Sequence, residues 1–257
     1  MELKSKQVSH FLKSLSNDFS LKLITVTDPA RIVSLISFNQ FLKNSSLEIK
    51  RIAVVSGSMT EPELLFCPAN AQVNLLSFED DPVLFDLNKD WSQSAWKQHH
   101  QVYDLVLCEQ VLEHLLDPAR AFHNLAALVK PGGVVHVSVP AINNTHGEPY
   151  YFYAGFPCAT LETFAVNAGL DLLECDSWRS DKASRMYATC DWAPIATSGP
   201  LRFFLWGLWL CRRDVRSGFG LLRGRVRNFI TFPFQGLFTP SKNNNAVVTW
   251  LFATNAR

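Results

Sequence analysis

The stretch YDLVLCEQVLEHLLDPARAFHNLAALVKPGGVVHVSVP, residues 103–140, decides the fold class of this 257-residue chain. It opens on YDLVLC and closes on VVHVSVP, two short apolar runs suited to buried strands. Between them, Asp117 and Pro118 signal the start of a helix. The apolar positions of that helix recur at helical spacing, at Phe122, Leu125, Ala126 and Val129. Because Lys130–Gly133 then predicts the helix end, the stretch indicates a strand, a helix and a strand in sequence.

Similar patterns extend on both sides of this unit. The residues before it predict strands at Ile52–Val55, at Val73–Leu76 and, as a short third, at Val83–Phe85. The residues after it predict a helix at Thr160–Gly169 and strands at Leu170–Trp178 and Ala246–Asn255. We therefore expect an α/β fold built on a mainly parallel sheet.

The chain divides into four segments. Residues 1–50 predict a helical lead-in, in which Asp28 and Pro29 mark the start of a helix. Residues 51–180 form the expected core. Residues 181–245 interrupt the alternation as an insertion, and residues 246–257 return to the core as its closing strand.

Composition limits the partners and the location that we expect. The 24 basic and 23 acidic side chains leave a formal net charge of +1, so no global field attracts nucleic acid or an anionic membrane. The six cysteines lack metal-ligand or redox spacing, which is typical of a reduced, cytoplasmic protein. We expect no signal peptide in the first residues, which lack a sustained apolar run, and no membrane span at 201–211, where the apolar run is too short.

The insertion has the most unusual composition. Residues 199–240 contain the apolar run FFLWGLWL, seven arginines and a single acidic residue, Asp214. The arginines are Arg202, Arg212, Arg213, Arg216, Arg223, Arg225 and Arg227. This mixture fits a segment lying on the inner face of a membrane, a lid over an acceptor, or the interface of a homo-oligomer.

Residues 103–140 resemble the class I S-adenosylmethionine-dependent methyltransferases, in the half from the fourth to the fifth strand. The shared motifs are a D-L-V strand, V-L-E-H, D-P, K-P-G-G and a strand ending in proline, in that order. A weaker resemblance covers about residues 50–178. It implies a Rossmann-like, mainly parallel seven-stranded sheet with helices on both faces and an antiparallel last strand. Within the superfamily, HGEPYYFYAGF at residues 146–156 is similar to a branch linked to polysaccharide and glycan biosynthesis.

The resemblance implies an S-adenosylmethionine site at the carboxyl ends of the first strands. In the family, a glycine-rich turn follows the first strand, whereas VVSGSMTEPE (54–63) has one glycine, Gly57. Ser56, Ser58 and Thr60 stand where the other glycines are usual. Gly57 can still allow a positive φ or a close approach, and the three hydroxyls offer hydrogen bonds. The alternative is a strand-to-helix turn that binds nothing.

Two acidic positions are candidates for the nucleoside part of the cofactor. Glu79 lies 22 positions after Gly57, near the offset at which an acidic side chain holds ribose hydroxyls. The alternative is a solvated acidic turn that also contains Asp80. By resemblance, Asp86 binds the adenine amino group while Leu87 packs on the base. The alternative for Asp86 is a local turn with Asn88.

Cys108 and Glu109 lie at the carboxyl end of the strand expected at residues 103–108, at the sheet edge that faces the cofactor in this topology. We expect both residues to line the cofactor site, with Glu109 contacting the amino-acid part of the cofactor or the acceptor. The alternative for Glu109 is an exposed loop carboxylate. By resemblance, Glu113 and His114 fix the local loop and helix rather than perform chemistry.

Methyl transfer is a displacement, which requires the donor and the acceptor to be aligned and dry. A hydroxyl acceptor also benefits from a base, and His146 is the best-placed titratable candidate. The side chains that we expect to shape the acceptor site are Glu148, Tyr150, Tyr151 and Tyr153. The alternative is a surface loop with packed tyrosines.

The resulting hypothesis is an S-adenosylmethionine-dependent methyltransferase that acts on an oxygen or nitrogen of a small or glycan-like acceptor. The alternative is an inactive, methyltransferase-like binding or scaffold protein. We expect no nucleic-acid partner and no metal ion.

Overall fold

The computed structural model describes residues 29–77, 86–90, 98–143, 146–179 and 246–256. Its helices are α3 (Pro29–Asn44), α4 (Pro118–Leu128) and α5 (Cys158–Asn167), with short 3-10 helices η1 (Pro62–Phe66) and η3 (Leu112–His114). Its strands are β1 (Arg51–Val55), β2 (Gln72–Leu76), β3 (Tyr103–Glu109), β4 (Val129–Pro140), β5 (Asp171–Arg179) and β6 (Ala246–Thr254).

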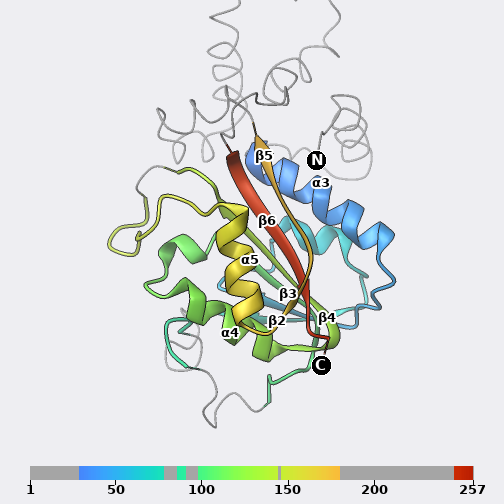
Figure 1. Ribbon diagram of the computed structural model, residues 1–257. Helices are drawn as coiled ribbons and strands as arrows, with labels where there is room; N and C mark the ends of the chain where they lie inside the picture. The colour runs from blue at the N-terminus through green and yellow to red at the C-terminus, as the bar shows by residue number, and fades with distance from the viewer. Residues whose placement is uncertain (1–28, 78–85, 91–97, 144–145, 180–245, 257) are drawn as a thin grey trace, which may run out of the picture.

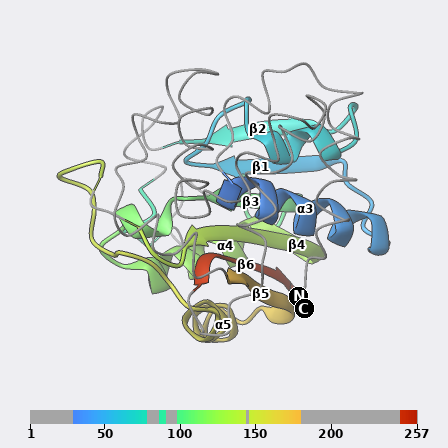
Figure 2. The ribbon, with the colours of Figure 1, turned by 90° about the horizontal axis from the view of Figure 1, so that it is seen from above.

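The strands form one sheet in the order β2-β1-β3-β4-β6-β5 (Figures 1 and 2). β1 pairs in parallel with β2 and β3, and β3 pairs in parallel with β4. β6 runs antiparallel between β4 and β5. The mainly parallel sheet and its antiparallel last strand are therefore confirmed. The described sheet has six strands, and the expected strand at Val83–Phe85 lies outside the described residues.

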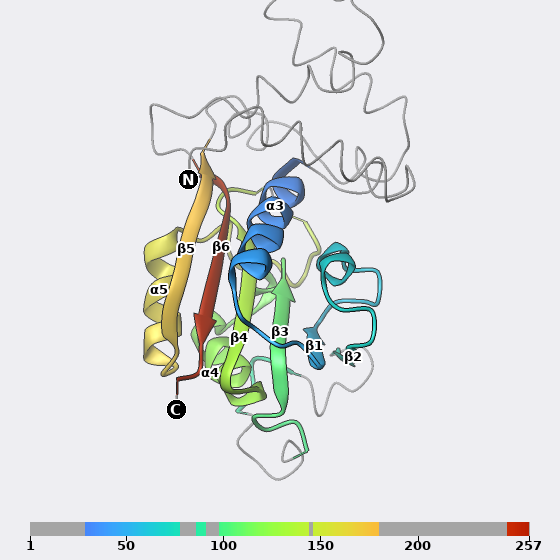
Figure 3. The ribbon, with the colours of Figure 1, turned by 90° about the vertical axis from the view of Figure 1, so that its right-hand side faces the viewer.

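Helices cover both faces of this sheet (Figure 3). α3 packs on the face that carries Ile52 and Val54 of β1, whereas α4 and α5 pack on the face that carries Ala53 and Val55. This alternation of side chains follows from the two-residue period of a strand buried on both sides. The expected Rossmann-like layering is confirmed, and Val33, Leu35, Ile36 and Phe38 of α3 are buried in the hydrophobic cluster on its face of the sheet.

The boundary between α4 and β4 differs from the sequence prediction. The helix ends at Leu128, so Val129 begins the strand, and the KPGG segment continues it rather than forming a stop. Asn255 explains this extension, because its side-chain amide donates to the Val129 carbonyl and its own carbonyl accepts from Gly132 N. The register between β3 and β4 shifts in the same region.

The other described elements lie close to their expected positions. α3 begins at Pro29, α5 begins two residues before Thr160, and β6 ends one residue before Asn255. Within the described segments, no helix has both the length and the apolar character that crossing a bilayer requires. The four described cysteines, Cys67, Cys108, Cys158 and Cys175, are free thiols. The insertion at 181–245 lies outside the described residues, so its role and the four-segment division stay predictions.

Candidate functional site

The candidate site lies at the edge of the sheet where its parallel strands end. β1 ends at Val55, β3 at Glu109 and β4 at Pro140, and carboxyl ends of parallel strands meet at one edge. The segments that follow these strands therefore come together. They carry two groups of polar side chains, which we call the Arg31 cluster and the Glu113 cluster.

The Arg31 cluster joins α3 to the ends of β1 and β3. Arg31 Nη2 lies 2.9 Å from Glu61 Oε2 and 2.9 Å from Glu63 Oε2. Its Nη1 donates to Glu109 Oε2 at 2.8 Å. Since Glu63 and Glu109 are almost fully buried, three carboxylates share one guanidinium in a setting of low solvation.

Glu109 also contacts two polar residues of β4. The Ser138 hydroxyl donates a short hydrogen bond to Glu109 Oε2, and His136 Nε2 lies 3.3 Å from Oε1. His136 Nδ1 donates to the Leu251 carbonyl, which fixes the ring orientation. Burial lowers the pKa of His136 to about 4, so its ring is neutral at physiological pH. Glu109 is thus a buried carboxylate, and the exposed-loop alternative is wrong.

Burial also controls the charge of the acids in the Arg31 cluster. It raises the pKa of Glu63 to about 7, with Glu109 adding to the rise and Arg31 opposing it. Burial likewise raises the pKa of Glu109 to about 7, although Arg31 and Ser138 oppose the shift. One oxygen of each carboxylate has no hydrogen-bond partner among the described residues. These acids fit a cationic ligand, because a sulfonium or ammonium would supply the missing positive charge.

The loop after β1 uses its one glycine for close approach. Ser56, rather than Gly57, takes the positive φ, at 54°. A Cβ on Gly57 would lie 2.8 Å from Val54 Cγ1 and 3.0 Å from Glu61 Oε1. Gly57 therefore lets the turn close over β1 and beside the Arg31 cluster.

The hydroxyls of this loop are engaged locally. The Ser58 and Thr60 hydroxyl oxygens lie 2.7 Å apart, and Thr60 N donates to Ser58 Oγ. Glu61 precedes η1, whose first turn contains Pro62 and Glu63, as the sequence indicates. Contacts from Ser56, Gly57 and Ser58 to a cofactor stay predictions.

The candidates for the nucleoside part lie in or near the segment after β2. Glu79 lies outside the described residues. Asp86 Oδ1 accepts hydrogen bonds from the backbone and side-chain amides of Asn88, so the local-turn alternative is present. Leu87 is buried in the core on the α4 face. A contact from Asp86 or Leu87 to adenine stays a prediction.

Cys108 lies on the opposite face of β3 from Leu107. Its thiol is fully buried among the side chains that pack against α4, and this burial raises its pKa well above the usual value. The structure thus brings Glu109 into the Arg31 cluster and places Cys108 in the core. A cofactor contact by Cys108 stays a prediction.

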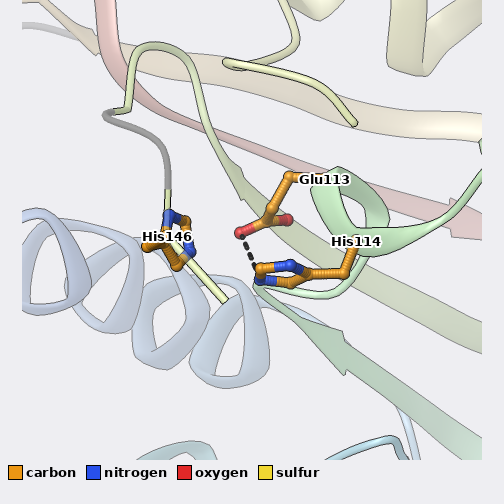
Figure 4. A group of neighbouring side chains, drawn as sticks. All are labelled: Glu113, His114 and His146. Atoms are coloured by element: carbon orange, nitrogen blue, oxygen red, sulfur yellow. Dashed lines mark ion pairs between the residues drawn. The ribbon is translucent and has the colours of Figure 1, made fainter. Parts of the chain in front are cut away.

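The Glu113 cluster is formed by two segments that follow neighbouring strands. Glu113 and His114 belong to η3, after β3, and His146 lies in the loop after β4. One carboxylate oxygen and one nitrogen from each ring all lie within 4.8 Å of one another. The rings of His114 and His146 meet edge to face, with centroids 4.9 Å apart. Figure 4 shows the three side chains gathered between η3 and the loop.

Backbone contacts hold the two segments of this cluster together. His114 Nδ1 donates to the Tyr150 carbonyl at 2.5 Å, and the amides of Phe152 and Tyr153 donate to the Glu113 carbonyl. The Tyr151 ring lies beside His146, with centroids 4.9 Å apart. The local contacts expected of Glu113 and His114 are therefore present.

The acceptor-shaping candidates divide by exposure. Tyr150 is 62% exposed, and Glu148 is also exposed. Tyr151 and Tyr153 are instead held to the protein, because their hydroxyls donate to the carbonyls of Asn143 and Leu116. Contacts from these four residues to an acceptor stay predictions.

Sequence reasoning missed Arg31, although a signal for it exists. Arg31 lies in the first turn of α3, where the helix dipole disfavours a cation and where acidic residues are absent. A cation at such a position indicates carboxylates from elsewhere in the fold. Which carboxylates these are depends on how η1 and β3 pack against α3, and no local pattern shows that.

Comparison with known proteins identifies the family. A family model described as a methyltransferase domain matches residues 24–173, more than half of the 257-residue chain. Ubiquinone biosynthesis O-methyltransferases of Yersinia pestis (strain Pestoides F) and Yersinia pseudotuberculosis (serotype O:1b, strain IP 31758) are each 51% identical over 47 residues. Each match covers 18% of this chain and 19% of the relative, about a fifth of the length of these curated proteins.

Solved structures of methyltransferases are also similar to this chain. Haemonchus contortus phosphoethanolamine N-methyltransferase 2, solved with S-adenosyl-L-methionine, is 13% identical with a TM-score of 0.45, over 88% of this chain and 53% of that one. A putative sarcosine dimethylglycine methyltransferase from Galdieria sulphuraria is 12% identical with a TM-score of 0.48, over 87% of this chain and 84% of that one. With the family match covering α3, β1, β2, β3, β4 and α5, the chain belongs to the methyltransferase domain family.

Proposed function

We propose that this protein transfers a methyl group from S-adenosylmethionine to the oxygen of a hydroxyl on a small acceptor, a class that includes glycan-like molecules. The observation that carries this proposal is the Glu113 cluster, which sets two imidazoles and a buried carboxylate at the carboxyl edge of the sheet. A hydroxyl must lose its proton to become methylated, and such a cluster can accept one. The local similarity to O-methyltransferases supports an oxygen acceptor.

The Arg31 cluster would hold the amino-acid end of the cofactor. The Arg31 guanidinium suits its carboxylate, and Glu63 and Glu109 suit its ammonium and sulfonium charges. When bound, the cofactor supplies a methyl carbon on a positively charged sulfur, and the sulfur leaves as the acceptor oxygen bonds to that carbon. The two clusters are close enough that the charges of Arg31 and Glu109 both influence the pKa of Glu113.

The Glu113 cluster would handle the proton of the acceptor. In this proposal His146 takes the hydroxyl proton on a ring nitrogen, and the resulting imidazolium is stabilised by the nearby Glu113 carboxylate. His114 stays neutral, because burial lowers its pKa and outweighs the opposing effect of its bond to Tyr150. Its bond to the Tyr150 carbonyl keeps the loop that carries His146 close to η3.

The test compares binding with turnover in the full chain. We expect calorimetric titration to show S-adenosylhomocysteine binding at micromolar concentration, in wild type and in His146→Ala alike. The rate of methyl transfer to a panel of catechols and sugar alcohols, measured as formation of S-adenosylhomocysteine, should fall at least 100-fold in His146→Ala. The exposed residue His123 on α4 offers a matched control, since His123→Ala removes an imidazole that belongs to neither cluster.

Two results would overturn the proposal. A folded protein that does not bind S-adenosylhomocysteine at millimolar concentration supports the alternative of a binding or scaffold protein. Transfer to amine analogues of the panel, with no transfer to the hydroxyl compounds, would leave a methyltransferase but contradict the oxygen acceptor.

A further inference from the structure

We infer that Glu113, His114 and His146 form a binding site for one divalent transition-metal ion of the zinc class. The inference deepens the proposed function, on which its catalytic consequence rests, and it assigns the cluster a ligand that the sequence did not indicate. The supporting observations are the donor set, the orientation of His114, the state of the Glu113 carboxylate and the location of the cluster.

The donor set is the first observation. One carboxylate oxygen and two imidazole nitrogens come together within 4.8 Å. Two histidines and one carboxylate are a ligand set that binds zinc or iron(II) with positions left open for substrate. Calcium and magnesium prefer sites made of oxygen ligands, so these two imidazoles favour a transition metal over them.

The orientation of His114 is the second observation. A carbonyl oxygen can only accept, so the 2.5 Å contact with Tyr150 requires the proton of His114 to be on Nδ1. Nε2 then carries the lone pair, and it lies 4.0 Å from Glu113 Oε1. Metal-binding histidines commonly donate their other N–H to a backbone carbonyl in this way, which fixes the tautomer before the ion arrives. Gly147 permits this fit, because a Cβ there would lie 3.1 Å from His114 Cε1.

The Glu113 carboxylate is the third observation. Its side chain is 1% exposed, and neither of its oxygens has a hydrogen-bond partner among the described residues. An unpartnered buried carboxylate is costly, so native structures normally compensate it. An ion between Glu113 and the two rings would supply that compensation.

The spacing of the cluster fits an ion after a small contraction. Ligand atoms about 2.1 Å from a common ion lie roughly 3 to 4 Å apart. Here the three ligand atoms lie within 4.8 Å of one another, and His114 Nε2 lies 4.0 Å from Glu113 Oε1. The required movement is about 1 Å at side-chain ends. His146 is in a loop rather than a helix or strand, so its ring can approach η3 by this amount.

The location gives the ion a role in the proposed reaction. If the acceptor binds beside Glu113, His114 and His146, as the proposed function requires, an ion held there would lower the pKa of its hydroxyl, and the proton would leave to water. His146 then acts as a ligand, and it no longer takes the proton itself. The site is separate from the Arg31 cluster, whose guanidinium already occupies the space between the other carboxylates.

The test measures metal binding directly, without turnover. The chelator-treated full chain is titrated with Zn²⁺ by calorimetry and with Co²⁺ by visible absorption. We expect one equivalent of Zn²⁺ to bind, with affinity at least 100-fold weaker in His146→Ala and in Glu113→Gln and unchanged in His123→Ala.

Equal Zn²⁺ affinity in wild type, His146→Ala and Glu113→Gln would overturn the inference, because the metal would then be bound elsewhere. So would the absence of Zn²⁺ binding in a wild-type protein that binds S-adenosylhomocysteine. That second result leaves the proposed methyl transfer standing, with His146 as the base. The methyl-transfer proposal fails separately, if the same folded sample binds Zn²⁺ at the cluster and does not bind S-adenosylhomocysteine.

Discussion

Arg31 Nη1 lies 2.8 Å from Glu109 Oε2, so a side chain from the first turn of α3 closes over the end of β3, 78 residues further along the chain. The same guanidinium binds Glu61 and Glu63, on the segment that follows β1. One arginine therefore connects three elements of the fold at the edge where we place the cofactor. Stability and ligand binding should both depend on it.

We expect Arg31→Met to lower the free energy of unfolding by about 3 kcal/mol at pH 8, because removal of one partner leaves buried carboxylates without compensation. The loss should be smaller at pH 6, where Glu63 and Glu109 take up protons. Urea unfolding followed by fluorescence measures both values. Arg120→Met is the control, since it breaks an exposed ion pair with Asp117 and should cost less than about 1 kcal/mol. Equal losses in the two variants would contradict the importance of the Arg31 cluster.

Burial raises the pKa of Glu63 and of Glu109 to about 7, and we expect this to make cofactor binding dependent on pH. A sulfonium cation favours the ionised carboxylates, so protons must leave these acids as it binds. We expect the affinity for S-adenosylmethionine to rise between pH 6 and pH 8, by up to about tenfold per pH unit for each proton released. S-adenosylhomocysteine, whose sulfur is neutral, should show a weaker dependence. Identical pH profiles for the two ligands would show that these acids do not face the sulfur.

The buried carboxylate of Glu113 should destabilise the metal-free protein at high pH. Burial raises its folded-state pKa from about 4.5 to about 7. Because the unfolded chain ionises first, the free energy of unfolding falls as pH rises from about 4.5 to about 7. Glu113→Gln removes the penalty and should stabilise the protein by up to about 3 kcal/mol at pH 8, with little change at pH 4. Glu148→Gln, an exposed control in the facing loop, should change neither value. Thermal unfolding at the two pH values checks this, and a destabilising Glu113→Gln at pH 8 would refute it.

The fold could be predicted from sequence because its signals are local. YDLVLC, the Asp117–Pro118 cap and VVHVSVP each specify an element within a few residues, and the structure has Asp117 accepting a hydrogen bond from Arg120 N at the start of α4. The sequence placed Val129 in the helix, whereas it begins β4. No local signal shows this, because the side-chain amide that donates to the Val129 carbonyl belongs to Asn255, 126 residues away.

The site was predicted only in part, since its contacts are long-range. Glu109 ends β3 and His146 follows β4, so topology alone places both at the carboxyl edge. The pairing of Glu109 with Arg31, and the meeting of Glu113 with His146, depend on which loops pack together. Periodicity and spacing describe single elements and carry no information on such pairs.

The aspartate of YDLVLC illustrates how a motif residue can serve the scaffold. Asp104 Oδ2 accepts hydrogen bonds from the backbone amides of Lys50 and Arg51 at 2.8 and 2.6 Å, and its other oxygen pairs with the Lys130 ammonium. Burial tends to raise its pKa, but these bonds outweigh burial and hold the pKa of the carboxyl below its usual value. Its stabilisation is therefore present above about pH 4 and is lost as pH falls through the folded-state pKa.

We expect Asp104→Asn to lower the free energy of unfolding by about 2 kcal/mol at pH 7, because an amide cannot pair with Lys130 and can accept through only one of its two terminal atoms. The difference from wild type should narrow as pH falls below about 4, because Asp104 takes up its proton in the unfolded chain before it does in the folded protein. Urea unfolding at pH 7 and pH 3 measures it, and Asp171→Asn, on the exposed start of β5, is the control. A difference that is the same at both pH values would mean that side-chain shape, rather than the carboxylate charge, connects β1 to β3 at this end of the sheet.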